Sequence, residues 1–383
     1  MATQDAILNE HITCIRAADW IIGWNRETGQ HDYQTGGDVA WKGDRLLQVG
    51  GHYAGPVTTE IEGAGRLVMP GLINIHCHPS QTAIFRGYVD EFGNPMLFYS
   101  SRHPFRQSFI HDHAAQLASA RYGLAELLSN GTTSIVDLSH AYPGWLDLLA
   151  DSGLRAWAAP MFRSARWWTD TGHETKYDWA PDLGQAAFDE AQAVMQTAES
   201  HCSGRLSALV SPAQVDTCTK ELLVAAAELA RETGRPLHTH AAQSYPEFRG
   251  INRRLDMTPV EYLHQIGFLG PTTILGHAVF TDEHPWLNWP RRNDLALLAS
   301  TGTSVAHCPT VFARDGTMMH HLGAYMDAGV NIALGTDTHP QNLFEEMRLA
   351  ETLARVAAGP RHTANTARVF HAATIGAAKL LGR

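Results

Sequence analysis

From about residue 68 onward, short β-branched runs alternate with longer helical patterns eight times. Amphipathic stretches such as 112–128, 220–233 and 318–328 separate the runs, and a glycine follows each stretch at or near the C-cap position of a helix. Eight strand–helix alternations predict a TIM-type (β/α)8 barrel with a parallel sheet. The predicted strands are 67–76, 133–138, 154–160, 205–212, 235–240, 272–278, 303–309 and 330–337.

The N-terminal part of the chain has a different pattern. Residues 11–67 contain short apolar runs separated by turns, with no helical period. We expect a hairpin over 38–51 and a turn-rich interruption over 27–37. The sequence therefore predicts two domains, a β-rich subdomain (1–67) that is part of a β-sandwich and a barrel (68–383). An α/β barrel uses about 250 residues or more as one unit, so the length fits.

Charge and composition exclude several classes of partner. The formal charge is 29 − 39 = −10, with no cluster of Lys or Arg, which argues against nucleic acids and anionic membranes. No run approaches the roughly 20 apolar residues of a membrane helix, and the first ten residues lack the pattern of a signal peptide. Five cysteines at scattered spacings, without a CxxC pair, predict a reduced, cytoplasmic protein.

The chain contains 22 histidines, and several of them close predicted strands. His76 and His78 close the first run, and because alternate residues of a strand point to the same side, both imidazoles can bind one ion. Barrel enzymes place their chemistry at these strand ends. The other strand ends carry His238, His240, His277, His307 and Asp337.

Any one of these histidines alone is more simply explained as a packed or hydrogen-bonded residue. Five of eight strand ends carrying His or Asp, including an HxH pair, instead predict a metal site. Three or four nitrogen and oxygen ligands with an open position are typical of a catalytic metal, because structural sites are closed and usually rich in thiolate.

Five motifs occur in an order that resembles a known family. The segments PGLINIHCHPSQTAIFRG, PLHTHAAQ, LGHAVFTDEH, VAHCP and ALGTDTHPQNLFEEMR, from residue 69 onward, resemble the amidohydrolase superfamily. The branch they resemble is the cytosine-deaminase-like, triazine hydrolase group, which includes guanine and adenosylhomocysteine deaminases. The resemblance implies a barrel with a small β-sandwich. It also implies a hydrolase that acts on carbon–nitrogen bonds other than peptide bonds, and a homodimer.

The resemblance also assigns roles to the strand-end residues. His76, His78, His240 and Asp337 match the ligands of a single divalent metal, zinc or iron, since histidine and carboxylate suit both ions. His277 matches the histidine that hydrogen-bonds the attacking water and the substrate.

Further residues are candidates for contact with a small-molecule substrate. Gln81, Arg86 and Asn342 match substrate-contacting positions of the family, and His307 closes the seventh predicted strand. Trp167 lies in the irregular stretch 161–184 and is a candidate substrate wall, although such aromatic residues about as often pack a loop down.

The expected chemistry is hydrolysis at an sp2 carbon of a small, N-heterocyclic substrate, by deamination or by cleavage of a cyclic amide. A bound divalent ion lowers the pKa of its water from near 16 toward about 7, which gives hydroxide at neutral pH. Asp337 then takes the proton and passes it to the leaving group, while His277 orients the water and stabilises developing charge.

The chain departs from the family at Gln243, where deaminases of this branch carry a glutamate. Glutamine can orient a group but cannot give or take a proton. Either the substrate needs no ring protonation, or Asp337 or another residue carries the proton, or the protein is a poor catalyst. Hydrolysis of a non-nitrogen leaving group, such as a halide or lactone oxygen, and a catalytically weak binding homologue are therefore alternatives.

Two other departures concern the pocket and the end of the chain. Many relatives have an Asn near the position of Phe312, which puts any particular purine or triazine substrate in doubt. Family members also continue past the last helix into strands that complete the sandwich, whereas this chain stops at Arg383. We therefore expect a partial sandwich with an exposed strand edge in 11–67.

Overall fold

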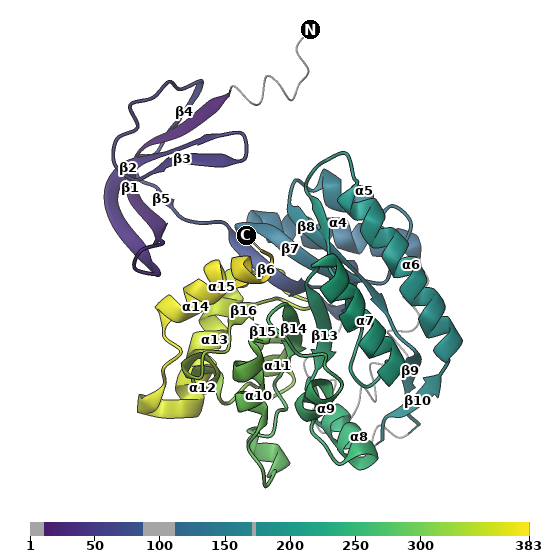
Figure 1. Cartoon of the computed structure of the whole chain (residues 1–383). Coiled ribbons are helices and arrows are strands. Elements are labelled where there is room, and N and C mark those ends of the chain that lie inside the picture. Colours follow the sequence, from purple (N-terminus) through teal and green to yellow (C-terminus); the bar gives the residue numbers. More distant parts are fainter. Residues whose placement is uncertain (1–10, 87–111, 171–173, 383) are drawn as a thin grey trace. The chain divides into compact units, whose positions relative to one another are not determined.

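A computed structural model describes residues 11–86, 112–170 and 174–382. Its contacts divide the chain into two units, one that ends at Gly71 and one that begins at Leu72. Figure 1 shows that the first unit is built of strands, and that the second combines strands with many helices.

The first unit is a five-stranded sheet in the order β3-β2-β1-β4, with β5 also paired to β1. Its strands are β1 (Ile12–Asn25), β2 (Gln30–Lys42), β3 (Arg45–Val49), β4 (Thr59–Glu62) and β5 (Leu67–Val68). The hairpin expected over 38–51 is confirmed as the antiparallel pair β2–β3. The turn-rich interruption expected over 27–37 is wrong, because β2 pairs with β1 from Gln30 onward. Cross-strand hydrogen bonds there outweigh the low strand propensity of Gly and Asp.

One sheet leaves much of the apolar surface of this unit exposed. Ala18, Ile21 and Val39 form a small buried cluster. Among the residues described between 11 and 71, the strands form this one sheet. The large apolar side chains that remain exposed are Trp20, Tyr33, Leu46, Leu47, Val49, Ile61 and Leu67.

A buried carboxylate organises the irregular part of this sheet. The register of β1 shifts between Ile15 and Ala18, and Asp38 accepts hydrogen bonds there from the Ala17 and Tyr53 amides, both at 2.9 Å. Arg16 Nη1 donates to the same carboxylate at 2.8 Å. Burial acts to raise the pKa of Asp38, but these donors outweigh it and lower the pKa to about 2.

We expect Asp38→Ala to destabilise the first unit by about 2–3 kcal/mol, because three donors lose their acceptor. In the native chain, the folded carboxyl has a pKa of about 2 against an ordinary 3.8. Its stabilisation is therefore complete above about pH 4 and disappears as the pH falls toward 2. Urea unfolding followed at pH 7 and pH 3 measures both effects. An Asp38→Ala variant with unchanged pH dependence between these values would contradict this account.

The second unit is a parallel barrel, as predicted. Its strands form two groups. The first has the order β6-β7-β8-β11, with β12 also paired to β8, and the second has the order β13-β14-β15-β16. Parallel bridges Val210↔Leu237 and Cys77↔Asp337 join the two groups and close the barrel. The strands are β6 (Leu72–Cys77), β7 (Thr132–Ser139), β8 (Arg155–Phe162), β11 (Leu206–Ala208), β12 (Ser211–Pro212), β13 (Leu237–Ala241), β14 (Thr273–His277), β15 (Ser304–His307) and β16 (Ile332–Leu334).

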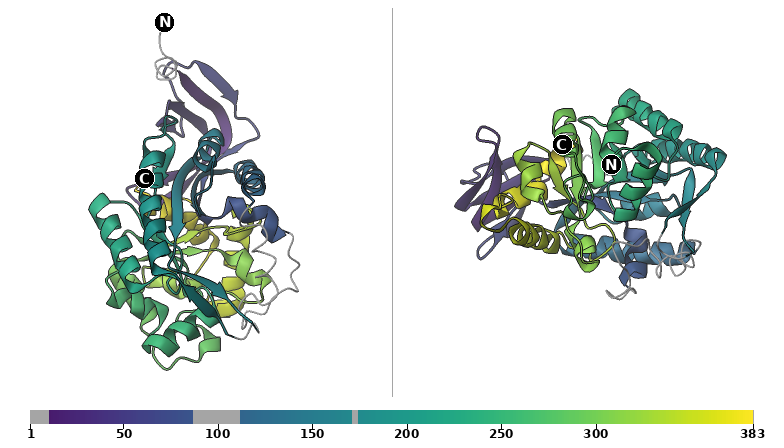
Figure 2. Two further views of the ribbon diagram at one scale, coloured as in Figure 1. Left: turned by 90° about the vertical axis from the view of Figure 1, so that its right-hand side faces the viewer. Right: turned by 90° about the horizontal axis from the view of Figure 1, so that it is seen from below.

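Helices lie outside the strands of the second unit, as Figures 1 and 2 show. Asp112 caps α4 through the Ala115 amide, and Gly234 ends α7 in a left-handed conformation, as the sequence predicts. The helix expected over 318–328 is shorter, because residues 318–321 are not helical. The helices are α2 (Thr82–Arg86), α4 (His113–Ser129), α5 (Trp145–Asp151), α6 (Pro181–Glu199), α7 (Lys220–Thr233), α8 (Tyr245–Leu255), α9 (Pro259–Gln265), α10 (Asp294–Thr301), α11 (Pro309–Arg314), α12 (Leu322–Asp327), α13 (Leu343–Ala358), α14 (Thr366–Ala372) and α15 (Ile375–Leu380).

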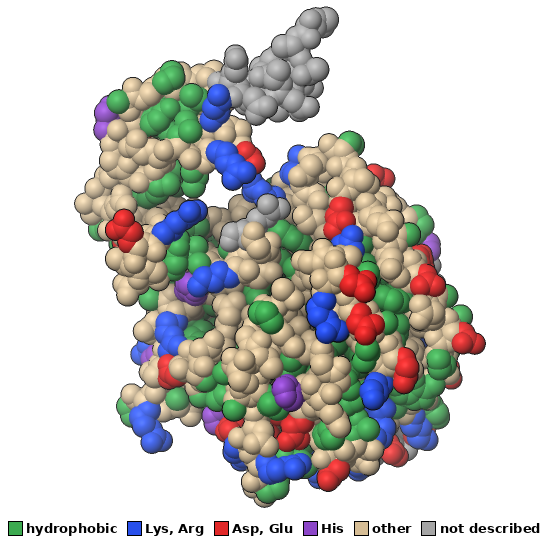
Figure 3. Space-filling view, viewed as in Figure 1, with side chains coloured by type: hydrophobic (Ala, Val, Ile, Leu, Met, Phe, Trp, Pro, Cys, Tyr) green, Lys and Arg blue, Asp and Glu red, His purple; other side chains and the backbone are tan. Residues whose placement is uncertain are grey.

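The stretch 161–184, which the sequence marks as irregular, contains a hairpin of β9 (Ala165–Trp168) and β10 (Lys176–Trp179). Inside the barrel, a cluster of buried apolar residues from most strands, including Ile75, Trp157 and Ile274, fills the space below the strand ends. No helix among the described residues is long and apolar enough to cross a membrane. Basic and acidic side chains are interspersed on the face of this unit seen in Figure 3.

Candidate metal centre and active site

Five side chains meet at the C-terminal ends of four barrel strands. His76 lies in β6 and His78 follows it, His240 lies in β13, His277 ends β14, and Asp337 follows β16. The Nε2 atoms of His78 and His240 are 3.3 Å apart, and Asp337 Oδ1 is 3.3 Å from His78 Nε2. Asp337 Oδ1 is 3.9 Å from His76 Nε2, and Asp337 Oδ2 is 3.9 Å from His277 Nε2. The structure brings together the four predicted ligands and the predicted catalytic histidine.

The donor atoms of this cluster fit a divalent ion. Two groups of three residues each have their donor atoms within 4.8 Å of one another. One group is His76, His240 and His277, and the other is His76, His78 and Asp337. Nitrogen and oxygen ligands held about 2.0–2.2 Å from a tetrahedral zinc ion are separated by about 3–4 Å. His76 Nε2 is buried and has no hydrogen-bond partner among the described residues, although it lies in the middle of the cluster. A ligand-binding role accounts for this atom, because an unpaired buried polar atom is otherwise unfavourable.

Hydrogen bonds from the other ring nitrogen orient each predicted histidine ligand. His78 Nδ1 donates to the Leu138 carbonyl, and His240 Nδ1 donates to the Ala213 carbonyl at 2.6 Å. A proton fixed on Nδ1 leaves the lone pair of Nε2 available to a metal. These backbone contacts therefore select the tautomer that the predicted site requires.

His76 is oriented by His238, which the sequence does not single out for this role. The two residues lie on β6 and β13, which are not neighbouring strands, and His76 Nδ1 is 2.9 Å from His238 Nε2 across the barrel interior. Both rings are fully buried, and burial together with neighbouring imidazoles lowers their pKa values, so both are neutral. His76 then donates from Nδ1 and His238 accepts. The HxH pair of the fifth predicted strand could have indicated this contact. Of that pair, only His240 was assigned a role, as a metal ligand, and His238 was not.

We expect His238→Phe to weaken zinc binding about 10–100-fold, the usual effect of removing the hydrogen-bond partner of a metal ligand. The matched control is His264→Phe on the exposed side of α9, which should leave zinc affinity unchanged. Competition with a chromophoric chelator measures both affinities. Equal zinc affinity of the His238→Phe variant and the native protein would show that His238 only fills space.

Two glycines allow the strands to approach His76. A Cβ atom on Gly276 would lie 2.9 Å from the His76 ring and 3.0 Å from the His238 ring, and one on Gly335 would lie 2.6 Å from the His76 carbonyl oxygen. Gly276 directly precedes His277 in β14, and Gly335 lies two residues before Asp337, directly after β16. They occur there because a side chain would displace the central imidazole.

The loop that carries Asp337 is fixed against the end of β6. The Asp337 amide donates to the His76 carbonyl at 3.0 Å, and the His78 amide donates to the Asp337 carbonyl at 2.7 Å. Asp337 has a positive φ of 55°. Next to it, the Thr336 hydroxyl donates to Gln341 Oε1 at 2.6 Å. Strained backbone of this kind persists where surrounding contacts determine it, and it is frequent at functional sites.

His277 and His307 are buried and neutral. Burial and then the surrounding imidazoles lower the pKa of His277, and burial lowers the pKa of His307 to about 4. The His277 ring packs edge-on against Phe312, with 4.9 Å between ring centroids. A neutral His277 can donate one hydrogen bond and accept another, which suits a group that orients water.

The remaining predicted substrate contacts are held by other partners. Arg86 bonds Glu126 and lies over the Tyr122 ring. The Asn342 side chain accepts from the amides of Phe344 and Glu345 and so caps α13. Trp167 is buried and donates from Nε1 to Asp216 at 2.9 Å, and Gln81 ends the short turn Pro79–Gln81 that follows His78. The structure therefore gives Arg86, Asn342 and Trp167 structural contacts, and their contact with substrate stays a prediction.

Gln243 lies between β13 and α8 beside a buried carboxyl. Glu247 Oε1 accepts from the Ala242 amide at 2.6 Å, and Glu247 Oε2 accepts from the Gln243 amide at 3.1 Å. Burial is the largest influence on Glu247 and raises its pKa well above the ordinary value, and nearby Asp216 adds to the effect. The sequence motifs do not identify Glu247 as an acidic group beside Gln243, the position where related deaminases carry glutamate.

Comparison with known proteins decides the family. The model of the Amidohydrolase family matches residues 67–383, which is most of the chain. This protein belongs to the amidohydrolase family. The predicted resemblance is confirmed, and with it the expectation of a hydrolase that acts on carbon–nitrogen bonds.

Several relatives of this amidohydrolase are deaminases by name. The 5-methylthioadenosine/S-adenosylhomocysteine deaminase of Halobacterium salinarum is 30% identical over 359 residues, which covers 90% of this chain and 76% of the relative. The 5'-deoxyadenosine deaminase of Methanothermobacter thermautotrophicus is 28% identical, with 90% and 76% covered.

Solved structures share the fold of this amidohydrolase. A guanine deaminase from C. acetobutylicum with bound guanine has a TM-score of 0.79 at 16% identity, with 97% of this chain and 87% of that chain covered. An adenosine deaminase from Xanthomonas campestris with bound zinc has a TM-score of 0.76 at 20% identity, with 97% and 80% covered. These likenesses confirm the barrel.

Proposed function

We propose that this amidohydrolase binds one zinc ion at the strand-end cluster and deaminates a small N-heterocyclic substrate by hydrolysis. The observation that carries the proposal is the convergence of His76, His78, His240, His277 and Asp337 on one point. The named activities of the relatives favour adenosine derivatives modified at the 5' position as the first substrates to test.

The side chains of the cluster have distinct roles in this proposal. A divalent ion, when bound, supplies a nucleophile at neutral pH by lowering the pKa of a water molecule. His76, His78 and His240 hold the ion through Nε2. Asp337 Oδ2 faces His277 Nε2 at 3.9 Å, so a water or substrate atom between them can contact both. Asp337 accepts the proton and returns it to the leaving amine, while neutral His277 donates a hydrogen bond to developing charge.

Removal of the metal should abolish turnover. After dialysis against a chelator, we expect activity to fall at least about 100-fold, because in this proposal the ion supplies the nucleophile at neutral pH. One equivalent of zinc should restore it, and a parallel titration with ferrous iron tests the other ion that this ligand set suits. Metal content measured by mass spectrometry accompanies each assay. Full activity in protein without metal would contradict the proposal.

A substrate screen separates the proposed deamination from its alternatives. The panel contains 5'-modified adenosines, purines, pyrimidines, triazines with amino or halide substituents, hydantoins and lactones. Release of ammonia from an adenosine derivative supports the proposal. Turnover confined to halides or lactones would favour a non-nitrogen leaving group, which Gln243 suits because such groups need less protonation. Binding without turnover of any compound would indicate a catalytically weak homologue.

Two further proposals concern the state of the protein in the cell. The reduced, scattered cysteines support a cytoplasmic location, and the resemblance to the family supports a homodimer. Fractionation of the native organism and light scattering of the purified protein test these proposals directly.

A further inference from the structure

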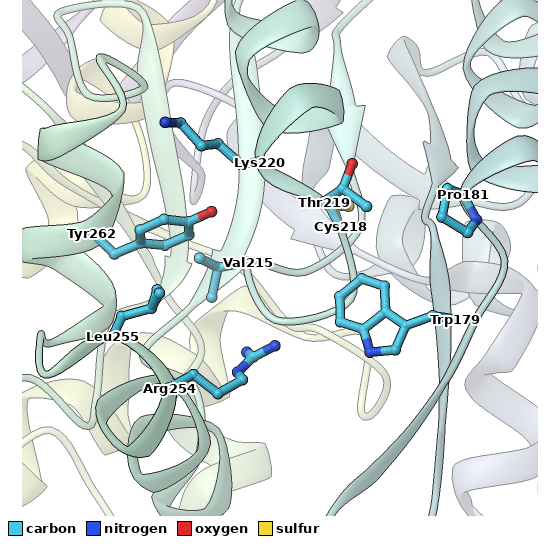
Figure 4. A pocket seen from close by; sticks show the side chains of 9 residues that line it. All are labelled: Trp179, Pro181, Val215, Cys218, Thr219, Lys220, Arg254, Leu255 and Tyr262. Carbon is cyan, nitrogen blue, oxygen red and sulfur yellow. The ribbon is translucent and has the colours of Figure 1, made fainter.

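A cavity of about 410 Å³ lies outside the metal cluster, on the rim of the barrel. Its walls come from the end of β10, the loop 213–219 that follows β12, and helices α8 and α9. Figure 4 shows Trp179 on one side and Tyr262 on the other, with Val215 between them. The lining side chains are mostly apolar or aromatic, so the walls favour a flat, apolar group.

Arg254 places a positive charge in this cavity. In Figure 4 its guanidinium lies in the space between Tyr262 and Trp179. It contacts the Tyr177 ring, 5.1 Å away, and its Nε donates to the Gly250 carbonyl at 3.3 Å. Among the described residues, no carboxylate lies within ion-pair distance of Arg254, although its charge acts to lower the pKa of the Asp216 carboxyl, which burial raises. Its guanidinium therefore retains donors for an anion.

Two cations next to each other along α8 have different surroundings. Arg253, the preceding residue of α8, points elsewhere and pairs with Glu174 at 3.7 Å. Lys220, at the first position of α7, lies at the rim of the cavity on the side of Tyr262. Within the described part of the chain, Lys220 also has no ion pair or hydrogen bond through its ammonium group. Two cations that form no ion pair with the described residues thus border one aromatic-walled cavity.

We propose that this cavity is a second ligand site, which binds a small organic anion composed of a flat apolar ring system and one carboxylate or phosphate. The ring system lies between Trp179 and Tyr262, and the anionic group bonds Arg254, with Lys220 adding attraction at the rim. A volume of about 410 Å³ accommodates a ligand of this size. The site is independent of the proposed deamination, because it contains none of the strand-end ligands.

The walls of the cavity are connected to the metal cluster through the backbone. The Val215 amide donates to the His240 carbonyl at 3.0 Å. The Ala213 carbonyl accepts two hydrogen bonds from His240, one from its backbone amide and one from its Nδ1. Helix α8, which carries Arg254, begins two residues after Gln243. A ligand in the cavity therefore rests on the two segments that position His240 and Gln243.

Calorimetric titration of the zinc-loaded protein with 2-naphthoate tests the site. We expect saturable binding that weakens at least about tenfold in Arg254→Gln, as for the loss of one charge-assisted hydrogen bond. Arg253→Gln is the matched control and should bind as the native protein does. The uncharged analogue 2-naphthalenemethanol should bind at least about tenfold more weakly than the acid. In a competition titration, displacement of 2-naphthoate by inorganic phosphate would show that the anionic group alone can occupy the site.

Three results would overturn the proposal. The first is equal affinity of Arg254→Gln and Arg253→Gln for 2-naphthoate, since the charge in the cavity would then play no part. The second is loss of binding in protein depleted of metal, which would place the carboxylate at the strand-end cluster. Retained binding in Trp179→Ala at native affinity would also contradict the position of the ring. Unfolding midpoints equal to that of the native protein show that each variant is folded.

Discussion

Asp337→Asn should reduce turnover by at least about 10⁴-fold. The carboxylate has two roles in the proposed site, as a ligand with Oδ1 at 3.3 Å from His78 Nε2 and as the proton carrier with Oδ2 facing His277. General acid–base catalysis alone contributes typically about 10²–10⁴-fold, and the amide of Asn neither carries a proton nor supplies a charged ligand. Initial rates at saturating zinc, with metal content measured in the same samples, test this expectation.

The Asp337→Asn variant should still fold, because the side chain projects from a strand end and does not fill the apolar core. Its backbone hydrogen bonds to His76 and His78 use main-chain atoms that Asn keeps. Asp189→Asn on the exposed face of α6 is the matched control and should retain native rates. Turnover within a factor of about ten of the native rate in Asp337→Asn would remove Asp337 from the proposed mechanism.

The barrel was predictable because each of its strands is short, buried and bounded by turn residues. The run 272–278 became β14 (Thr273–His277), and the capped stretch at Asp112 became α4. The error in the first unit arose where pairing with another strand decides the local structure. The polar segment after Gly29 reads as a turn, yet it forms β2 because β1 supplies a complementary row of backbone groups. Single-sequence patterns do not contain that information.

The histidines of the cluster were predictable from strand periodicity, whereas their supporting contacts were not. Alternation within a strand places His76 and His78 on one face, and the ends of parallel strands share one edge. The contact of His238 with His76 spans 162 positions of sequence, and the link from Thr336 to Gln341 depends on the fold of one loop. No spacing rule connects residues whose pairing is set by how the barrel closes.

Substitution of Gln243 by Glu should increase the rate of deamination about 100-fold. The amide of Gln243 cannot transfer a proton to a ring nitrogen, and a positioned acid contributes typically about 10²–10⁴-fold. The backbone amide of Gln243 already donates to Glu247, whose pKa is raised by burial. A neighbouring carboxyl group raises the pKa of a carboxyl group introduced at position 243, which favours the protonated form that serves as the acid. Ammonia release from 5'-deoxyadenosine at pH 7 measures the gain.

The controls for Gln243→Glu separate proton transfer from a change of shape or charge. Gln243→Met keeps the side-chain length but removes its hydrogen bonds, and should lower the native rate. Gln265→Glu adds the same charge on the exposed end of α9 and should change nothing. A rate for Gln243→Glu equal to or below the native rate, at equal zinc content, would show that the reaction does not depend on an acid at position 243. A native protein inactive on every substrate, beside an active Gln243→Glu variant, would instead show a deaminase that has lost its acid, and the proposed function would be wrong for this chain.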